Sequence, residues 1–397
     1  MIIALLALAL RLCAIPFLPD VSSPYYAEYG EIVKNLHAGN GYSLYHMTDA
    51  GIQLWFDPSD RPYPSAYMPP GYVAFLYPFF WIETVPVRNV LIILAQALIS
   101  LLVLAGAYRV TTIHFGETAG LIAALMVCIL PEFIYASVTF SPVVLYQGLV
   151  LAFFLWFHHG EQIYFRQAVG SAVLIATATL FRSEFLLFGV AVMTIELCRK
   201  RYRKVVMITG FTILLLLPWA VRNTSALGAF VPLTTNGGLN LYRGHNPEQI
   251  GAWGDPVVLE RLKLLEPGRD LEVRMQELFL RRAFEDIRAQ PLEAFLSGFT
   301  KLFHLWVFDP GNERSQHPVY LVPWLALLGL FAIGAGSTRS WGRHQLLWLF
   351  LISSSLVAFV FFALPRYQTI MKIVIVPFAA YGMVALPALW RRLRGQQ

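Results

Sequence analysis

The chain contains few charged residues: Asp, Glu, Lys and Arg make up only 14% of its 397 residues. Soluble domains carry about 25% charged residues, and 57% of this chain is hydrophobic, which excludes an ordinary soluble globular protein. Cysteine is also scarce, and Cys13, Cys128 and Cys198 all lie in or beside apolar segments. Their spacing indicates neither a metal site nor a disulfide framework.

Other absences narrow the function further. No basic stretch with interleaved aromatic residues lies outside the apolar segments, so the net charge of +6 does not indicate nucleic-acid binding. An excess of Lys and Arg is instead expected in the cytoplasmic loops of a membrane protein. His158, His159 and His245 have no partners at metal-ligand spacing, and the sequence predicts no metal and no cofactor. No tandem repeat or linker is present, which favours one domain over residues 1–397.

The chain is rich in apolar segments near the ~20 residues needed to cross a bilayer. They predict an all-α polytopic membrane protein with about ten transmembrane helices, at 2–17, 88–108, 117–135, 141–158, 168–181, 184–198, 205–221, 319–335, 346–363 and 370–390. Because the number is even, both termini are expected on one side of the membrane.

Basic residues predict which side that is. Those in loops on the side of the termini are Arg109, Arg166, the run 199–204, Arg339, Arg343 and the tail 391–394. Cytoplasmic loops carry most Lys and Arg, so both termini are predicted to be cytoplasmic. Residues 167–198 form either two short helices joined at Arg182-Ser-Glu184, or one long tilted helix with an ion pair inside the membrane. The helical hairpin is favoured, because only it leaves the basic run 199–204 in the cytoplasm.

Two long segments, 18–85 and 222–316, then lie outside the cytoplasm and form a cap. In the first, residues 25–38 have helical character and end at Gly39 and Gly41. Residues 71–81 are apolar, short and bounded by prolines, and predict a helix lying in the membrane interface. In the second segment, residues 257–289 predict one charged amphipathic helix.

Glu28 is the first candidate for catalysis. Glu28, Ile32, Asn35 and Leu36 are spaced by three and four residues and share one helix face. Ile32 and Leu36 would bring Glu28 close to an apolar boundary, where a carboxylate becomes more basic. The alternative is a solvated carboxylate on a polar loop. Asp20, directly after the first apolar segment, is a second candidate base or a residue that only ends a helix.

Basic residues on the outer side are candidates to bind phosphate, because Arg binds phosphate oxygens with two parallel hydrogen bonds. These residues are Arg182, Arg222, Arg243, Arg314, Arg366 and Lys372. Snorkelling to lipid headgroups or a buried ion pair is the alternative for each of them. The polar stretch 234–247 includes Asn240 and Tyr242 and suits either a bound polyhydroxylated group or an ordinary loop.

Four stretches together resemble the GT-C superfamily of membrane glycosyltransferases. They are the first-loop pattern from Glu28 to Ser43 with its Gly-Asn-Gly-Tyr, the stretch 65–72 with its Pro-Pro-Gly-Tyr, the segment 218–223 followed by 235–242 and 246–247, and Pro-Arg-Tyr at 365–367. The closest likeness is to bacterial relatives of the protein-mannosyl and lipid A aminoarabinose transferases, of the glycosyltransferase family 39 type. Together these motifs span nearly the whole chain.

The resemblance implies a GT-C-like bundle in a bacterial inner (plasma) membrane. It implies an inverting transferase, metal-independent or metal-tolerant, that moves a sugar from a polyprenyl-phosphate donor to a lipid, glycan or protein acceptor. A first-loop carboxylate would act as general base, and Arg222, Arg366, Lys372 and Arg182 would hold the donor phosphate. Tyr29, Tyr67, Asn240 and Tyr242 are the substrate-binding candidates. Membrane lipids are the other expected partners.

The chain departs from the family pattern in the first loop. Many members have Asp four residues before the loop tyrosine, but Tyr25 stands there before Tyr29. Some members use Glu at the position of Glu28, so Glu28 is favoured over Asp20 as the base. The Lys that often precedes Pro-Pro is Met68 here, and Arg366 or Arg222 would replace its phosphate contact.

Two other function classes stay open at this stage. The altered aspartate position is compatible with a non-catalytic scaffold of an envelope-polysaccharide complex. A transporter of a lipid-linked saccharide would have charges within its spans and an inverted repeat, and the chain has few of the former and no visible repeat.

Overall fold

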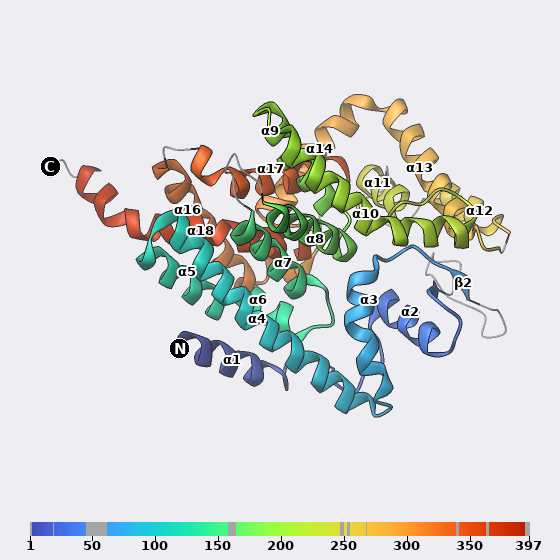
Figure 1. Ribbon diagram of the computed structural model, residues 1–397, viewed down its shortest axis with the longest axis horizontal. Coiled ribbons are helices and arrows are strands. Elements are labelled where there is room, and N and C mark those ends of the chain that lie inside the picture. The colour runs from blue at the N-terminus through green and yellow to red at the C-terminus, as the bar shows by residue number, and fades with distance from the viewer. Residues whose placement is uncertain are drawn as a thin grey trace.

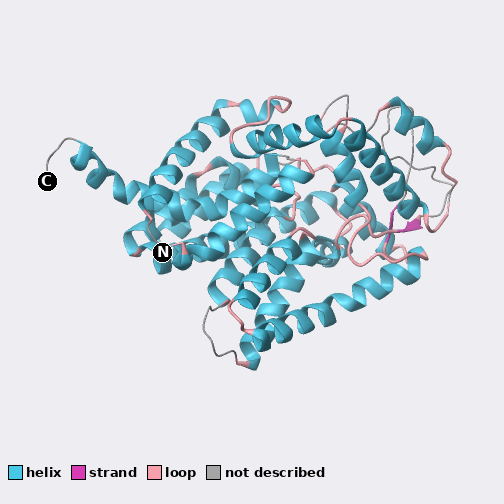
Figure 2. Cartoon of the chain, turned by 90° about the horizontal axis from the view of Figure 1, so that it is seen from above, coloured by secondary structure: helices cyan, strands magenta, loops and turns pink. Residues whose placement is uncertain are grey.

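The computed structural model describes residues 2–18, 20–44, 62–157, 164–246, 250–251, 255–266, 268–338, 341–362 and 365–393. His158, His159, Arg339 and Arg394 lie outside these ranges. The fold is almost entirely helical, as Figure 2 shows. One two-stranded antiparallel sheet is present in the described part, in which Ser43 pairs with Pro64 and Leu44 with Tyr63.

The apolar helices form the body of the molecule (Figure 1). They are α1 Ile2–Ala14, α4 Val85–Phe115, α5 Glu117–Ile129, α6 Pro131–Val138, α7 Val143–Trp156, α8 Phe165–Phe181, α9 Phe185–Cys198, α10 Tyr202–Leu227, α16 Pro318–Ser337, α17 Gln345–Val360 and α18 Pro365–Leu393, with the short η2 Gly342–His344 before α17.

Five described helices are long and apolar enough to cross a membrane: α4, α10, α16, α17 with η2, and α18. The pair α5 and α6, bent by 57° at their junction, would make a sixth span. Four more apolar helices, α1, α7, α8 and α9, have only 10–17 residues. Each of the ten predicted spans therefore contains an apolar helix or helix pair, and the protein is a multi-pass membrane protein. Ten complete crossings stay a prediction.

The hairpin at 165–198 is confirmed. Helix α8 ends at Phe181, Arg182 takes an extended conformation, and α9 begins at Phe185. Gly189 of α9 packs against Ile175 of α8, where an added Cβ would lie 3.2 Å from its side chain. Because both residues lie seven positions from Arg182, the two helices fold back on each other, which excludes one long tilted helix.

A buried arginine stabilises the break between α5 and α6. In a continuous helix the carbonyl of Val127 would accept from the amide of residue 131, but Pro131 has no N–H. Arg11 of α1 is fully buried and donates to the carbonyl oxygens of Val127 at 3.2 Å and Cys128 at 3.4 Å. Inside a membrane such freed carbonyls need a partner, and this accounts for the one arginine in the first apolar segment.

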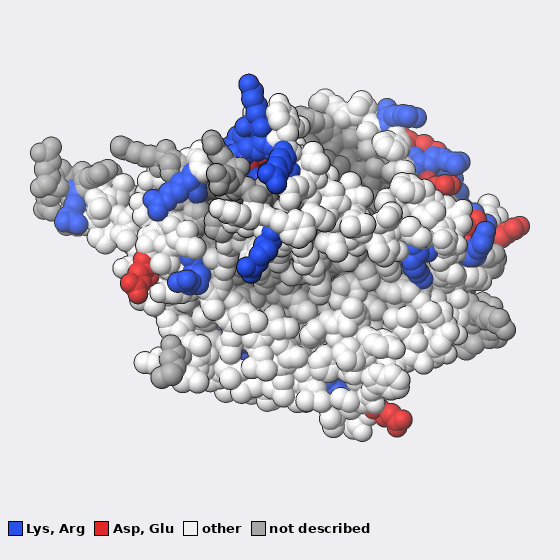
Figure 3. Space-filling view, in the orientation of Figure 1, with Lys and Arg blue, Asp and Glu red and all other residues white. Residues whose placement is uncertain are grey.

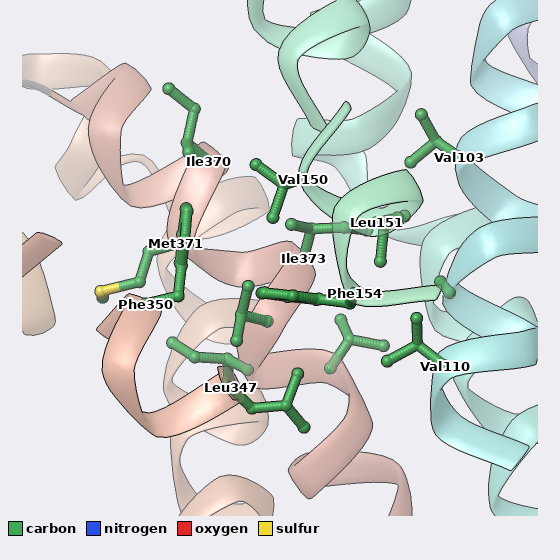
Figure 4. Close-up of a cluster of buried hydrophobic side chains, with 14 of the residues drawn as sticks. Val103, Val110, Val150, Leu151, Phe154, Leu347, Phe350, Ile370, Met371 and Ile373 are labelled. Atoms are coloured by element: carbon green, nitrogen blue, oxygen red, sulfur yellow. The ribbon is translucent and has the colours of Figure 1, made fainter. Parts of the chain in front are cut away.

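The main core lies where α4, α7, α17 and α18 meet (Figure 4). Phe154 of α7 points toward Leu347 and Phe350 of α17, and Ile373 of α18 lies beside them. Helices α16 and α18 approach so closely that an added Cβ on Gly334 or Gly382 would overlap the facing backbone. Such small-residue contacts are typical of membrane helix packing.

The cap elements are α2 Ala27–His37, β1 Ser43–Leu44, β2 Tyr63–Pro64, α3 Pro70–Leu76, η1 Tyr77–Trp81, α11 Gly237–His245, α12 Pro256–Lys263, α13 Leu271–Ala289, α14 Pro291–Trp306 and α15 Glu313–Gln316. The helix predicted at 25–38 is confirmed. The stretch predicted as one helix at 71–81 forms α3 followed by the 3-10 helix η1, and its position in the membrane interface stays a prediction. The single helix predicted at 257–289 is wrong: it is divided into α12 and α13, between which the sequence has Pro267 and Gly268. Helix α14 was not predicted.

The cap elements α2, α3, α12 and α13 lie at one end of the molecule, on the right in Figure 1. Helix α1 begins and α18 ends toward the other end. Figure 3 shows charged side chains mostly at the two ends and along the upper edge, with a largely uncharged face between them. This distribution agrees with a bundle whose middle faces lipid.

Candidate active site

Helix α2 presents Glu28 from a firmly anchored first turn. The hydroxyl of Tyr26, just before α2, accepts from Arg88 Nε at 2.9 Å and donates to Asn89, both at the start of α4. Ile32 and Val33 of α2 are fully buried in a cluster with residues of α3 and α4. The carboxylate of Glu28 is half-buried at the edge of this packing.

The Pro-Pro-Gly-Tyr element packs the first loop against the end of α8. Pro70 is the first residue of α3, a position where its missing N–H costs nothing. An added Cβ at Gly71 would overlap the Phe181 ring and lie 2.8 Å from the carbonyl oxygen of Leu180. Only glycine permits this approach, which brings α3 next to the turn that carries Arg182.

Tyr72 connects this packing to α2. It is fully buried, donates to Gln96 Oε1 of α4 at 2.9 Å, and meets the Tyr29 ring edge-on with centroids 5.1 Å apart. Tyr29 of α2 is thereby held against α3, which itself packs against the end of α8 just before Arg182.

Arg182 lies at the centre of the site. It forms an ion pair with Glu184 in the turn between α8 and α9. Its guanidinium carbon lies 4.7 Å from the ring centroid of Tyr367 and 5.8 Å from that of Tyr146. Tyr367 follows the exposed Arg366 at the start of α18, so the α8–α9 turn and α18 share one surface.

Four charged side chains affect the pKa of Tyr29. Burial raises this pKa to about 12; Arg182 and Arg366 act against the rise, and the carboxylates of Glu28 and Glu184 add to it. The phenol of Tyr29 therefore lies within the electrostatic reach of two arginines and two glutamates.

Tyr67 adds a third arginine to this group. Burial raises the pKa of Tyr67 well above its usual range, Glu28 raises it further, and Arg243 and Arg366 lower it. Burial lowers the pKa of Arg243, whose guanidinium carbon lies 4.5 Å from the Phe362 ring centroid. Arg243 Nε and Nη2 also donate to the Gly251 carbonyl at 2.9 and 2.7 Å.

We name this group the arginine–glutamate cluster. It consists of Glu28, Tyr29, Tyr67, Arg182, Glu184, Arg243, Arg366 and Tyr367. Its members come from α2, the turn before α3, the α8–α9 turn, α11 and α18, which are far apart in the sequence. Five of the sequence-predicted site residues, Glu28, Tyr29, Tyr67, Arg182 and Arg366, meet here.

Arg222 is placed differently. Its guanidinium donates to the carbonyl oxygens of Tyr42 and Ser65, which flank the two short strands, and lies 5.1 Å from the Tyr42 ring centroid. Glu272 of α13 supports the same region by accepting from the amide of Ala66 at 2.8 Å and from Thr235 at 2.7 Å. Arg222 therefore ties the first loop to α10.

Lys372 is buried within α18 and has a partner of its own. Its ammonium forms an ion pair with Glu132 of α6 and lies 4.4 Å from the Trp324 ring centroid. This is the buried pair that sequence reasoning gives as the alternative to phosphate binding, and it places Lys372 among the helices.

Asp20 and the two polar candidates of α11 are not among the residues grouped with Glu28. Asp20 is exposed and accepts from the amide of Ser22 at 3.0 Å and its hydroxyl at 2.6 Å, so its charge stabilises a turn after α1. Tyr242 is fully buried in the cap and donates to Asp255 at 3.3 Å. Asn240 is half-exposed on the same helix.

Sequence reasoning named Arg243 among the outer basic residues that could bind phosphate, without preferring it, and missed Glu184 and Tyr367. Arg243 lies between motifs, and nothing in its neighbours links it to Glu28. Tyr367 was part of the Pro-Arg-Tyr motif and could have been included with Arg366. In the described residues, no three His, Cys, Asp or Glu side chains come close enough to hold a metal ion.

The chain has a GT-C-like fold, as its motifs led us to expect. No family model matches it, and no curated protein sequence matches it. The archaeal oligosaccharyltransferase AglB from Archaeoglobus fulgidus, solved with an inhibitory peptide and a dolichol-phosphate, aligns over 99% of this chain at TM-score 0.58 and 14% identity. An oligosaccharyltransferase of the same organism, tethered with an acceptor peptide, aligns over 100% with the same score and identity.

Both alignments cover 50% of the oligosaccharyltransferase, so this chain spans about half its length. ArnT from Cupriavidus metallidurans, bound to undecaprenyl phosphate, aligns over 98% of this chain and 78% of its own at TM-score 0.42 and 11% identity. At these identities the similarity to AglB shows the fold, and function has to be argued from the site.

Proposed function

We propose that the protein is a glycosyltransferase that moves a sugar from a polyprenyl-phosphate carrier to an acceptor outside the cytoplasm. The observation that carries the proposal is that the charges of Glu28, Arg182, Arg243 and Arg366 all act on two neighbouring phenols, those of Tyr29 and Tyr67. A carboxylate beside several guanidinium groups suits a reaction that takes a proton from one group and releases a phosphate from another.

The charge of the cluster fits a monophosphate donor. Its three arginines and two glutamates leave one net positive charge when both carboxylates are ionised. A sugar joined to a lipid through one phosphate carries one negative charge, and this charge grows when the sugar leaves. Arginine holds such oxygens with directed, paired hydrogen bonds, so the cluster stabilises the leaving group more strongly than the intact donor.

In the proposed reaction Glu28 accepts the proton of an acceptor hydroxyl. The acceptor oxygen attacks the anomeric carbon of the donor sugar, and the bond from that carbon to the phosphate oxygen breaks with inversion. Arg182, Arg243 and Arg366 hold the released polyprenyl phosphate. Tyr29 and Tyr67, whose phenols stay protonated at neutral pH, can donate hydrogen bonds to the sugar or the phosphate.

Two further observations support a lipid-linked donor. The apolar helices make this a membrane protein, and a polyprenyl chain dissolves in the membrane, which would bring its headgroup to the cap. The AglB structure with the same fold was solved with a dolichol-phosphate, which is a lipid phosphate of this chemical type.

The proposal also fixes an orientation in a bacterial inner membrane. The cluster lies at the α8–α9 turn and the start of α18, while the basic run 199–204 lies beyond the other end of α9. If that run is cytoplasmic, the cluster faces outward, and both termini are cytoplasmic. Cysteine labelling from each side of sealed vesicles, at residues 184 and 203, tests this orientation.

The test of function uses purified protein in lipid vesicles with a panel of radiolabelled polyprenyl-phosphate sugars and native membrane extract as acceptor. Transfer of label, with release of polyprenyl phosphate in equal amount, supports the proposal. Failure of every donor, or translocation of the intact donor across the vesicle without transfer, overturns it in favour of the scaffold or the transporter.

A further inference from the structure

Helix α14 carries a lysine in an unusual environment. One face of α14 is exposed and apolar, with Leu292, Phe295 and Phe299 more than half exposed. On the opposite face Lys301 is fully buried, and it is the charged side chain of that face. In the described part of the chain no carboxylate forms an ion pair with it. Burying a cation without a counterion is costly, so the burial of the Lys301 ammonium must be offset by other interactions.

Both partners of Lys301 are backbone carbonyls at helix ends. Its ammonium donates to the carbonyl of Gly244, next to the last residue of α11, at 3.2 Å. It also donates to the carbonyl of Val360, the last residue of α17, at 3.3 Å. These carbonyls have no partner within their own helices, and each helix dipole presents its negative end there. One ammonium thus joins two helix C-termini.

The two helix ends that Lys301 joins are in direct contact. An added Cβ at Gly244 would overlap the backbone carbonyl of Phe361. The guanidinium of Arg243, the residue before Gly244, lies on the ring of Phe362. Residues 360–362 in turn come shortly before Arg366 and Tyr367 in the sequence. The junction therefore determines where Arg243 lies relative to the start of α18.

We infer that Lys301 is a positioning residue that holds Arg243 in the arginine–glutamate cluster by pinning the end of α11 to the end of α17. The inference rests on the proposed function, since it assigns Arg243 to the donor phosphate. Lys301 itself does not touch the phosphate. Removing its ammonium frees the end of α11, and the Arg243 side chain loses its fixed approach.

The ionisation of Lys301 gives a readout that a purely structural role would not move. Burial lowers the pKa of Lys301 to about 8. Above that pH the amine is neutral, and its attraction to the two helix ends weakens. His245 on α11 is a titratable group that interacts electrostatically with Lys301. Burial, and then the charge of Lys301, lower the pKa of His245 to about 4, so this histidine stays neutral near the pKa of Lys301. The His304–Asp309 pair lies at the end of α14, one turn away.

The experiment measures binding of undecaprenyl phosphate to purified protein in nanodiscs from pH 7.5 to 9.5, above the second phosphate ionisation near ~6. It compares wild type with Lys301→Met, Lys301→Arg and Arg243→Gln. Lys263→Met is the matched control, because it removes an exposed cap lysine that pairs with Glu260. Hydrogen exchange of α11 in each protein reports whether the helix end has loosened, and circular dichroism confirms folding.

For Lys301→Met at pH 7.5 we expect affinity to fall roughly tenfold, the size of one lost hydrogen bond to a charged group, with faster exchange at α11. Wild-type affinity should fall as pH rises through about 8, whereas Lys301→Arg and Arg243→Gln should show no such step. Wild-type-like affinity in Lys301→Met, or the same pH step in that variant, overturns the inference while leaving the transferase intact. Wild type that binds but never transfers overturns the proposed function alone.

Discussion

Lys372 and Glu132 form a buried ion pair although 240 residues separate them in the sequence. Glu132 lies at the start of α6, just after the 57° bend, and Lys372 lies two turns into α18. Because the Lys372 ammonium also lies over the Trp324 ring of α16, the pair joins three helices. It therefore fixes α18, whose first turn carries Arg366 and Tyr367.

The first prediction concerns this pair. Lys372→Met leaves a buried carboxylate without its cation, and removing one partner of such a pair costs about 3–5 kcal/mol. Glu132→Gln should cost a similar amount, and the double variant should recover a large part of the loss. Thermal unfolding in nanodiscs measures all three. If Lys372→Met instead kept its Tm and only raised the KM for the donor, Lys372 would be a phosphate ligand.

The second prediction concerns Arg182. Arg182→Gln should raise the KM for the polyprenyl-phosphate donor roughly ten- to hundredfold, because a hydrogen bond to a charged group is lost. Arg182→Lys should recover only part of this, since Lys cannot bind two phosphate oxygens with a rigid fork. Arg261→Gln, which removes an exposed cap arginine, is the control. A donor KM unchanged in Arg182→Gln would remove Arg182 from the phosphate site.

The third prediction concerns the Pro-Pro-Gly-Tyr element. Gly71→Ala should destabilise the protein by about 1–3 kcal/mol and reduce transfer, because the new methyl group overlaps Phe181 and pushes α3 away from the Arg182 turn. Gly210→Ala is the matched control in another helix, since nothing lies within 4 Å of its added Cβ. Equal Tm values for the two variants would show that α3 does not need this close approach.

Much of the bundle could be predicted because membrane helices depend mainly on local sequence features. Long apolar runs bounded by Gly, Pro and charged residues gave the apolar helices, and Arg182-Ser-Glu184 marked the hairpin. The span predicted at 88–108 was too short at both ends, since α4 runs from Val85 to Phe115. At its C-terminal end Thr111 and Thr112 continue the helix beyond the apolar run. The single helix expected at 257–289 was wrong because its charged pattern continues on both sides of the connection between α12 and α13.

The site could be predicted only in part, because side-chain partners depend on the tertiary fold. Glu28 and Arg182 stood out from local spacing and position. Arg243 was only one of several outer basic residues, since its place is determined by the contact of Gly244 with Phe361. Likewise no local pattern distinguishes Lys372, which has Glu132 as a partner, from Arg366, which is an exposed member of the cluster.

The most direct test of the account compares sugar transfer by Glu28→Gln, Asp20→Asn and wild type, using the donor that wild type accepts. Glu28→Gln keeps the shape of the side chain but removes the base, so its rate should fall roughly 10²–10⁴-fold. Asp20→Asn should keep nearly the wild-type rate, because Asp20 stabilises only its own turn. Full activity in Glu28→Gln, together with loss in Asp20→Asn, would contradict the account and make Asp20 the base.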